Sequence, residues 1–329
     1  MAEINSLINF GIINIDKPSG PTSFSITEFV RKSLGISKAS HMGTLDPKVT
    51  GVLPITLGRA CRLASHFITH DKTYIGILHT HSVQDLENLQ KIINEKFLGK
   101  IKQTPPHKSA VKRVERTREV YHFKFLESSE DKKYFLFECK VEGGTYIRKI
   151  CSDLGEMIDG ANMAELRRTE AGIFGEDFGN NNNNNNMKDE VLSLINKRSE
   201  ASPNQGRAGG KLKTEKKSFN SFNSNFHKLH NLFDFEKAIA EYKNGDDKKL
   251  KEMIVPAEEA IKKVLPIVEV KKESVKRLLI GNPIRKLDTL GEIPKIEDSF
   301  TVFCNDKFIG TYKKTDEEDI VGRAEFVKN

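Results

Sequence analysis

Cysteine is scarce in this sequence, and its few copies form no recognisable pattern. Cys61, Cys139, Cys151 and Cys304 are widely separated, so there is no CxxC pair to predict a zinc site or a disulfide framework. Scattered cysteines of this kind are typical of reduced thiols in a protein core. We therefore expect a cytoplasmic protein without bound metal.

Long apolar runs are also missing. No stretch approaches the roughly 18 residues that a membrane span requires, and the N-terminus lacks a signal-peptide pattern. Apolar residues make up 37% of the chain and charged residues 30%, which predicts a very polar surface and no membrane partner. The 329 residues are enough for two domains, each with its own core.

Positive charge is unevenly distributed along the chain. The net charge of +7 is modest, but one segment holds seven basic residues and a single acid, Glu115: Lys100, Lys102, Lys108, Lys112, Arg113, Arg116 and Arg118. This density favours a phosphate-binding surface with nucleic acid as the partner. Lysines that protect an exposed strand edge would give the same pattern. Nothing resembles a helix-turn-helix or a zinc finger, so a DNA-binding regulator has no support beyond charge.

Hydrophobic periodicity predicts strands mixed with helices up to about residue 169. Ser25 and Glu28 form a capping-box pattern for a helix that Gly35 ends. The other predicted elements are a strand at Gly11–Asp16, a strand at Val52–Leu57, a short helix over Ala60–Phe67, a helix at Leu86–Phe97 and a helix at Thr145–Ile158, followed by a loop at Gly160–Asn162. This mixture predicts an α+β fold.

The composition changes abruptly near residue 179. Seven consecutive asparagines, Asn180–Asn186, open a stretch rich in Ser, Asn, Lys and Gly. Such a segment cannot bury enough surface to offset its ordering entropy, so residues 179–226 are predicted to be a disordered insertion. A flexible basic arm that contacts RNA is the functional alternative.

The end of the chain has the pattern of a small β-barrel. Short helices are predicted at Phe235–Tyr242 and Asp247–Met253, and the strand-rich remainder contains regularly spaced turn residues: Gly281, Pro283, Gly291, Gly310 and Gly322. We therefore place a first domain at residues 1–255 and a second at residues 256–329.

The segment around Asp46 holds a single carboxylate in a turn rich in Gly and Pro. Asp beside Pro with Gly nearby predicts a turn, and a turn can present a carboxylate to a cleft. Asp46 could instead serve only to cap or fix that turn. Local chemistry alone favours this second, structural interpretation.

Several sequence motifs, taken in their order along the chain, favour the first interpretation, in which the turn presents Asp46 to a cleft. Together they resemble the TruB/dyskerin family of RNA pseudouridine synthases, and the string at 105–113 is closer to the archaeal dyskerin-like branch. The motifs are IDKPSGPTS at 15–23, HMGTLDPKVTGVLPI at 41–55, KTY at 72–74, PPHKSAVKR at 105–113, GTYIR at 144–148 and LRRT at 166–169. The C-terminal unit is similar to a PUA domain, an RNA-binding barrel. Asn162 and Met42 depart from the family pattern, but neither removes a group that the chemistry requires.

The resemblance implies a fold, an activity and a set of site residues. The fold would be α+β, with a central mixed, largely antiparallel sheet and a small C-terminal β-barrel. Asp46 would be the nucleophile, Arg148 its ion-pair partner, and Tyr74 a stacking residue or proton relay. His41, Tyr146, Leu166 and Lys17 would line the substrate site, with Lys17 shaping its floor. Lys108, Lys112, Arg113, Arg167 and Arg168 would contact the RNA backbone. His41 could instead be a purely structural histidine.

The same resemblance implies the partners of the chain. The substrate would be uridine 55 in the tRNA T-loop, ribosomal RNA selected by a box H/ACA guide RNA, or both. Guide-directed action would also involve small accessory proteins. No metal or redox cofactor is required by the bond changes. A non-catalytic RNA-binding scaffold on the same fold is the rival, and the presence of Asp46, Tyr74 and Arg148 argues against it.

Overall fold

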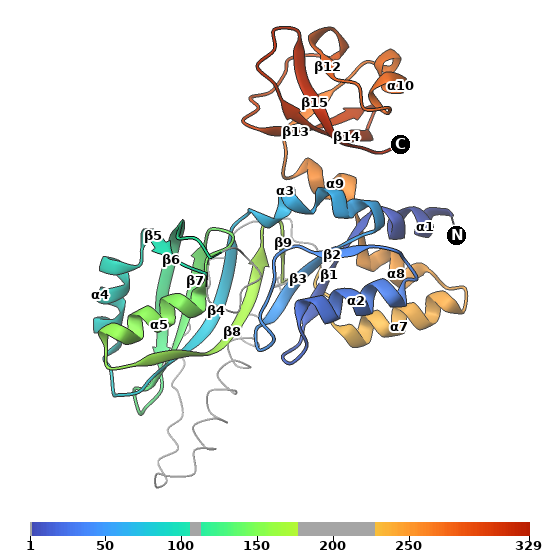
Figure 1. Cartoon of the computed structure of the whole chain (residues 1–329). Helices are drawn as coiled ribbons and strands as arrows, with labels where there is room; N and C mark the ends of the chain where they lie inside the picture. The colour runs from blue at the N-terminus through green and yellow to red at the C-terminus, as the bar shows by residue number, and fades with distance from the viewer. Residues whose placement is uncertain (1, 106–112, 177–227) are drawn as a thin grey trace.

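The computed structural model describes residues 2–105, 113–176 and 228–329 (Figure 1). Most of these residues are built on one large sheet, with strand order β10-β1-β3-β8-β4-β7-β6-β5; β2 pairs with β3, and β9 with β8. The strands are β1 Gly11–Lys17, β2 Ala39–His41, β3 Thr50–Leu57, β4 Lys72–Thr80, β5 Gly99–Gln103, β6 Arg116–Ser128, β7 Tyr134–Val141, β8 Ala161–Ala171, β9 Phe174–Gly175 and β10 Ile254–Pro256.

This sheet is antiparallel except at one junction, where β3 runs parallel to β8. The two strands pair through only Thr50 with Arg167 and Gly51 with Arg168. Gly51 has a φ of +99°, and a Cβ there would lie 2.2 Å from the Arg168 carbonyl oxygen, so only glycine fits this close approach. We call this junction the seam, because it joins the β10-β1-β3 half of the sheet to the β8-β4-β7-β6-β5 half. The α+β class and the mixed, largely antiparallel sheet are confirmed.

Helices flank both halves of the sheet. The helices are α1 Ala2–Asn9, α2 Ser23–Ser33, α3 Ala64–Ile68, α4 Leu86–Lys96, α5 Ile147–Met157, α7 Leu232–Lys243, α8 Lys248–Met253, α9 Ala257–Lys262 and α10 Val275–Leu278, with a 3₁₀ turn at Gly58–Leu63 before α3. In Figure 1, α2 and α7 lie beside the β1-β3 half, and α4 and α5 lie against the β4-β7-β6 half. Apolar residues spaced at helical period, such as Ile26 and Val30 in α2, point into the core.

Two local predictions were wrong. The cap of α2 is Thr22, whose Oγ1 accepts a hydrogen bond from the Ser25 amide, whereas Glu28 pairs with Arg31 one turn on. Because Thr22 precedes the first helical residue, it and not Ser25 satisfies the free amides of the first turn. Residues 161 and 162, predicted as a loop, already belong to β8. Helix α1 was not predicted.

The C-terminal unit contains a second sheet, with strand order β11-β13-β14-β15-β12. Its strands are β11 Ile267–Glu269, β12 Ile284–Arg285, β13 Ser299–Cys304, β14 Lys307–Lys314 and β15 Ile320–Val327, and they enclose their own apolar core. A small, strand-rich C-terminal unit is therefore confirmed. The boundary after residue 255 stays a prediction.

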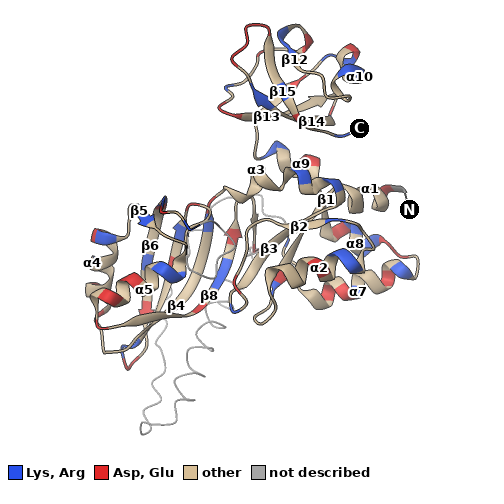
Figure 2. Ribbon diagram, in the orientation of Figure 1, with Lys and Arg blue, Asp and Glu red and all other residues tan. Residues whose placement is uncertain are grey.

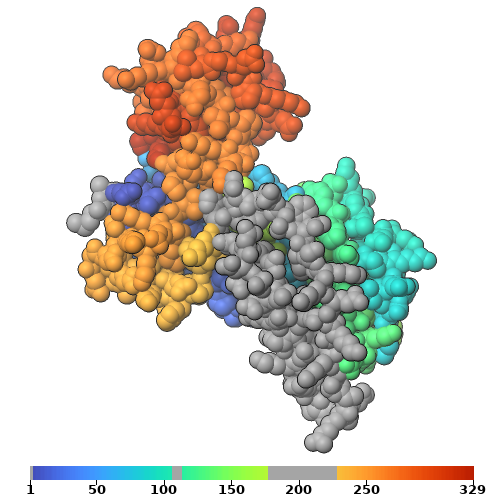
Figure 3. Space-filling view, turned by 180° about the vertical axis from the view of Figure 1, so that it is seen from behind, coloured from blue at the N-terminus to red at the C-terminus, as the bar shows by residue number. Residues whose placement is uncertain are grey.

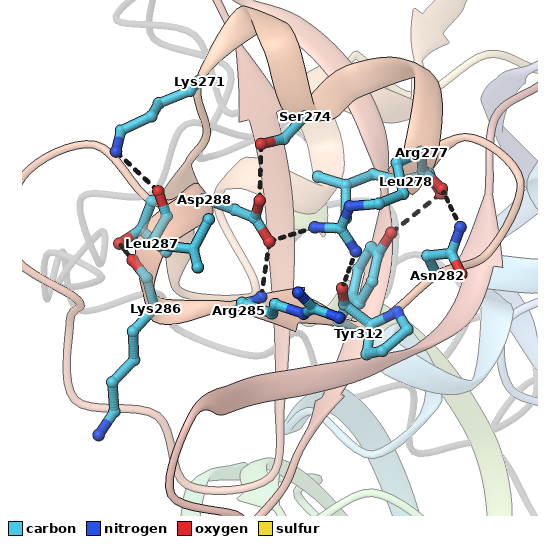
Figure 4. A network of polar contacts seen from close by, with 12 residues as sticks. Lys271, Ser274, Arg277, Leu278, Asn282, Arg285, Lys286, Leu287, Asp288 and Tyr312 are labelled. Atoms are coloured by element: carbon cyan, nitrogen blue, oxygen red, sulfur yellow. Dashed lines mark hydrogen bonds and ion pairs between the residues drawn. The ribbon is translucent and has the colours of Figure 1, made fainter.

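A buried carboxylate organises one side of this unit (Figure 4). Asp288 accepts hydrogen bonds from the Ser274 hydroxyl at 2.7 Å, from the Arg285 amide at 2.8 Å and from Arg277. Burial alone would raise the pKa of the Asp288 carboxyl, but these hydrogen bonds hold it below its ordinary value. The network thus fixes the segment between α10 and β12 with an ionised group whose partners compensate its desolvation.

Aromatic rings join the C-terminal unit to the start of the chain. Phe10, just before β1, stacks on Phe308 and Phe326 with ring centroids 5.6 and 5.8 Å apart. Lys328 lies over the Phe10 ring and bonds Glu258 at 3.0 Å. These contacts attach the C-terminal unit, orange to red in Figures 1 and 3, on the side of the large sheet where α3 and α9 lie.

Three of the predictions fall on residues outside the described ranges: the insertion at 179–226, Lys108 and Lys112. Within the described ranges, no helix is both long enough and apolar enough to span a bilayer.

Candidate active site

The turn that carries Asp46 is wrapped around a lysine ammonium. Lys17, at the end of β1, is fully buried, and its Nζ donates to the carbonyl oxygens of Pro18, Pro47 and Val49 at 2.8–2.9 Å. Burial lowers the pKa of Lys17, and Asp46 opposes that shift. Because its three donors are engaged by backbone, Lys17 shapes the loop beneath the site. Direct contact with substrate, which was also predicted, does not fit this burial.

Helix α2 holds the residue that precedes Asp46. The hydroxyl of Ser23 donates to the Leu45 carbonyl and accepts from the Leu45 amide, both at 2.8 Å. The Leu45 side chain is buried in the core, and the Val49 amide closes the turn on the Asp46 carbonyl at 3.0 Å. The backbone on both sides of Asp46 is therefore fixed before any ligand arrives.

The first turn of α5 supplies Arg148. Tyr146 is the N-cap residue of this helix, and its backbone is hydrogen-bonded to the Gln103 side chain at the end of β5. The Gln103 Nε2 donates to the Tyr146 carbonyl at 3.2 Å, and the Gln103 Oε1 accepts from the Tyr146 amide at 2.9 Å. Gln103 is itself buried. A glutamine 43 residues away in sequence thus fixes the start of the helix that presents Arg148.

Asp46 and Arg148 form an ion pair across these elements. The Arg148 Nη2 lies 2.5 Å from the Asp46 Oδ2, and the two side chains are 54% and 50% exposed. The Asp46 carboxylate is therefore half open to solvent. In the free protein it can meet an incoming ligand with its cation already in place.

Tyr74 lies on β4, beside β8, with its side chain buried. It is in register with Arg168 of β8, and the phenol and the guanidinium are hydrogen-bonded. Burial raises the pKa of the Tyr74 phenol, and the charge and hydrogen bond of Arg168 only partly offset this. The group is thus a neutral phenol at neutral pH, which favours stacking over a role as a general base.

The remaining predicted site residues lie on β8, at the start of α5 and on β2. Leu166 of β8 is buried two residues before Arg168, next to Gly76 in the register of β4. Tyr146 is half-buried at the start of α5. His41 of β2 has both ring nitrogens within 3.1 Å of a hydroxyl, Nδ1 of Thr27 and Nε2 of Thr44. Burial, then the charge of Arg168, lowers the pKa of His41, so the geometry favours the structural alternative for this histidine.

Of the two predicted RNA-backbone contacts in the LRRT string, the one at Arg168 is contradicted by burial, and the one at Arg167 stays a prediction. Arg168 is 1% exposed and donates to the Val52 and Gly43 carbonyls at 2.8 and 2.9 Å. Arg167 is paired with Asp16 at 2.9 Å and with Glu176 at 2.6 Å. Both residues lie at the seam, where their side chains bond the adjoining strands and turns, but only Arg168 is shut off from solvent, because Arg167 stays 24% exposed. Arg113 is exposed, as a phosphate contact requires.

Lys72, two residues before Tyr74, is a buried cation that the sequence did not reveal. Its Nζ donates to the carbonyls of Ile68 and His70, and its Cε lies 3.7 Å from where a Cβ on Gly43 would be. Burial and the neighbouring Arg168 lower the pKa of Lys72 to about 7, against the opposing charge of Asp71.

Replacing Lys72 by Met should flatten the dependence of stability on pH. The pKa of this lysine is about 7 in the fold and roughly 10.4 in an unfolded chain, so the unfolded state binds more protons between those values. The free energy of unfolding therefore rises with pH across this window, by at most ~1.4 kcal/mol per pH unit. Denaturant titrations from about pH 6 to 10 measure the slope. The exposed Lys124→Met variant is the control and should keep the wild-type slope of unfolding free energy against pH. If Lys72→Met also kept the wild-type slope, the lowered pKa assigned to Lys72 would be contradicted.

No group of three or more His, Cys, Asp or Glu side chains in the described ranges is arranged to hold a metal ion.

Comparison with known proteins connects this geometry to a family. Residues 31–147 match the family model described as "TruB family pseudouridylate synthase (N terminal domain)". This stretch of the chain is therefore similar to the N-terminal domain of that family. The match includes Asp46, Tyr74 and Tyr146 and ends one residue before Arg148.

The curated proteins similar to this chain include several from archaea. A probable tRNA pseudouridine synthase B from Methanopyrus kandleri is 46% identical over 175 residues, which cover 53% of this chain and 51% of that protein. A protein of the same description from Thermococcus onnurineus is 47% identical over 171 residues, covering 52% and 50%. The chain spans about half the length of the curated relatives it matches.

Solved structures extend the likeness beyond residues 31–147. "Crystal Structure of a Cbf5-Nop10-Gar1 Complex" matches with a TM-score of 0.74 and 29% identity, covering 99% of this chain and 86% of that one. "Structure of H/ACA RNP bound to a substrate RNA containing 2'-deoxyuridine" matches with a TM-score of 0.74 and 27% identity, covering 98% and 86%. The fold of the chain is therefore similar to that of Cbf5, C-terminal unit included.

Proposed function

We propose that this chain is an RNA pseudouridine synthase that uses Asp46 as its nucleophile. The observation that carries the proposal is the Asp46–Arg148 ion pair, 2.5 Å long and open to solvent, in a chain similar to the TruB family. Tyr74 and Leu166 lie on adjacent strands of the same sheet. The rival hypothesis, a non-catalytic scaffold, does not explain why a carboxylate and its cation are paired at a half-exposed position.

The reaction needs few groups. The C1′–N1 bond of uridine breaks, the base turns within the site, and C1′ then bonds to C5; C5 loses a proton and N1 gains one. A carboxylate suits this sequence because it can form a covalent intermediate and then depart. The contact with Arg148 fixes the direction of the Asp46 carboxylate and offsets part of its negative charge when bound RNA excludes water.

The target base must leave its stack to reach Asp46. Flipping costs a few kcal/mol, which stacking in the enzyme offsets. We assign that stacking to the Tyr74 ring, with Leu166 as an apolar wall; both lie on adjacent strands and are largely buried in the free protein, so bound RNA must expose them. The neutral state of the Tyr74 phenol supports stacking as its main role.

Two substitutions of Tyr74 distinguish the contribution of its ring to activity from that of its hydroxyl. Base–aromatic stacking is worth about 1–3 kcal/mol, so Tyr74→Leu should lower kcat/KM by about 5- to 150-fold. Tyr74→Phe keeps the ring and should lose less than about tenfold, while the missing hydrogen bond to Arg168 lowers the free energy of unfolding by about 1–3 kcal/mol. Steady-state kinetics and denaturant titration measure both. Equal losses of activity in the two variants would assign the catalytic effect to the hydroxyl.

Two substrates are supported for this chain. The curated relatives are described as probable tRNA pseudouridine synthases, which supports uridine 55 of the tRNA T-loop. The structural relatives are Cbf5 complexes with Nop10, Gar1 or H/ACA RNA, which supports guide-directed modification with small accessory proteins. Exposed lysines on β5, Lys100 and Lys102, provide a basic edge for RNA at one end of the large sheet (Figure 2).

One pair of assays distinguishes the two substrates. The purified chain is incubated with a tRNA transcript alone, and separately with guide RNA, a complementary target RNA and accessory proteins. Pseudouridine in the first assay assigns stand-alone action on tRNA. Product only in the second assigns guide-directed action, and product in neither would contradict the proposed function.

A further inference from the structure

The proposed active site is divided between the two halves of the large sheet. Asp46 lies in the loop between β2 and β3, whereas Tyr74 and Leu166 belong to β4 and β8 on the other side of the seam. The strands that meet at the seam pair through only two residues each. Because this ladder is so short, backbone hydrogen bonds alone determine the relative orientation of the two halves only weakly.

One side chain spans this division. From β8, the Arg168 guanidinium donates through Nε to the Val52 carbonyl of β3 at 2.8 Å and through Nη2 to the Gly43 carbonyl at 2.9 Å. On its own half of the sheet it is hydrogen-bonded to the Tyr74 phenol. It is 1% exposed, so water does not compete for these contacts.

We propose that Arg168 is a positioning residue, whose guanidinium sets the Asp46 loop against the Tyr74 ring across the seam. This inference rests on the proposed function for its kinetic consequence. Gly43 lies three residues before Asp46, so a shift of its carbonyl moves the carboxylate as well. Arg168 does not reach the reacting atoms, and it acts through Gly43, Val52 and Tyr74.

The planar fork of arginine is what this position requires. It presents donors in fixed directions, so one group can engage two carbonyls and a phenol at once. A lysine in the same place offers a mobile point charge that can keep one carbonyl but not the full set. The space above the fork is also limited, since a Cβ on Gly43 would lie 3.2 Å from the Arg168 Nη1.

The neighbouring Arg167 is a natural comparison. It lies on the same strand and also crosses the seam, but its partners are Asp16 and Glu176 and not the Asp46 loop. Removing either arginine deprives buried acceptors of a charged donor, so both changes should lower thermal stability. Only the loss of Arg168 should loosen the loop.

The test combines kinetics with hydrogen exchange on the full chain. Because a displacement of about 1 Å can cost about 100-fold, Arg168→Met should lower kcat by about that factor. Its RNA Kd should stay within about threefold of wild type, and the amides of residues 42–49 should exchange at least ~10-fold faster. Arg168→Lys should recover part of kcat. In Arg167→Met the exchange of residues 42–49 should be unchanged, and Arg31→Met on the outer face of α2 serves as the surface control.

Two outcomes overturn the proposal. One is a folded Arg168→Met protein whose kcat is within about twofold of wild type. The other is unchanged exchange of residues 42–49 in that protein. If Arg168→Met does not fold, Gly43→Ala carries the test: its added Cβ meets the fork and its φ of +97° is strained for alanine, so kcat should fall with RNA binding kept. If the wild type makes no pseudouridine, the proposed function fails, and the exchange experiment still decides whether Arg168 positions the loop.

Discussion

Asp46→Asn is expected to abolish pseudouridine formation while leaving the protein folded and RNA affinity within a few fold. The change replaces the nucleophilic oxygen with a neutral amide of nearly the same size. Loss of a nucleophile costs on the order of 10⁴-fold or more in kcat. The ion pair with Arg148 is half exposed, and such pairs contribute about 0–1 kcal/mol to stability, so the melting temperature should barely move. Single-turnover assays on RNA with a quantified target uridine measure the loss.

Asp153→Asn is the matched control for this change. Asp153 is also an aspartate in an ion pair, with Lys149 one turn earlier on α5, but it lies outside the proposed site. Its variant should retain activity. Product from Asp46→Asn at a rate near wild type would show that another group is the nucleophile.

Arg148→Met should produce the second-largest loss, about 10²- to 10³-fold in kcat. In the proposed mechanism the guanidinium does not react, but its 2.5 Å contact fixes the direction of the Asp46 carboxylate. Preorganised electrostatic groups of this kind are typically worth that factor. Arg148→Lys should recover only part of the rate, because a lysine keeps the charge but not the planar guanidinium that directs the contact with Asp46. Kinetics under saturating RNA separate this effect on kcat from any effect on KM.

Lys149→Met tests whether the loss is specific to Arg148. Lys149 is the next residue of α5, carries the same charge and pairs with Asp153. Its loss should change kcat by less than about threefold, because any effect through bulk charge on RNA binding appears in KM. If Lys149→Met and Arg148→Met lost activity equally, the role of Arg148 would be general attraction of RNA and not the alignment of Asp46.

The central pair of the site could be predicted from sequence, because its motifs are local. Asp46 lies in a Gly- and Pro-rich turn and Arg148 follows a short GTYI string, and each motif is complete within a few residues. The structure brings these two side chains within 2.5 Å. Their catalytic roles remain predictions until the variants are measured.

The LRRT string shows where local reasoning stops. Two adjacent arginines in a basic run suggested a surface, but the side chains of both are held within the seam, Arg168 by carbonyls and Arg167 by carboxylates. Burial of a charge depends on partners that arrive from distant segments, and those partners carry no signal near residue 168. The same limit hid Gln103, Ser23 and Lys72, whose contacts join parts of the chain that only the tertiary fold brings together.

The fold itself followed the hydrophobic pattern more closely. Strand β1 and helix α5 were predicted within a few residues of their observed bounds, because each has a continuous apolar face. The parallel pairing of β3 with β8 was not predictable in this way, since it rests on a glycine with positive φ and two residue pairs more than a hundred residues apart.

The most direct test of the account is a pseudouridine assay with two purified chains, wild type and Asp46→Asn. Each is given a tRNA transcript, and then guide RNA, target RNA and accessory proteins, and pseudouridines are mapped at single-nucleotide resolution. The account predicts pseudouridine at a defined uridine with the wild type in at least one condition and none with Asp46→Asn in either. Equal product from both chains, or no product from the wild type in either condition, would contradict it.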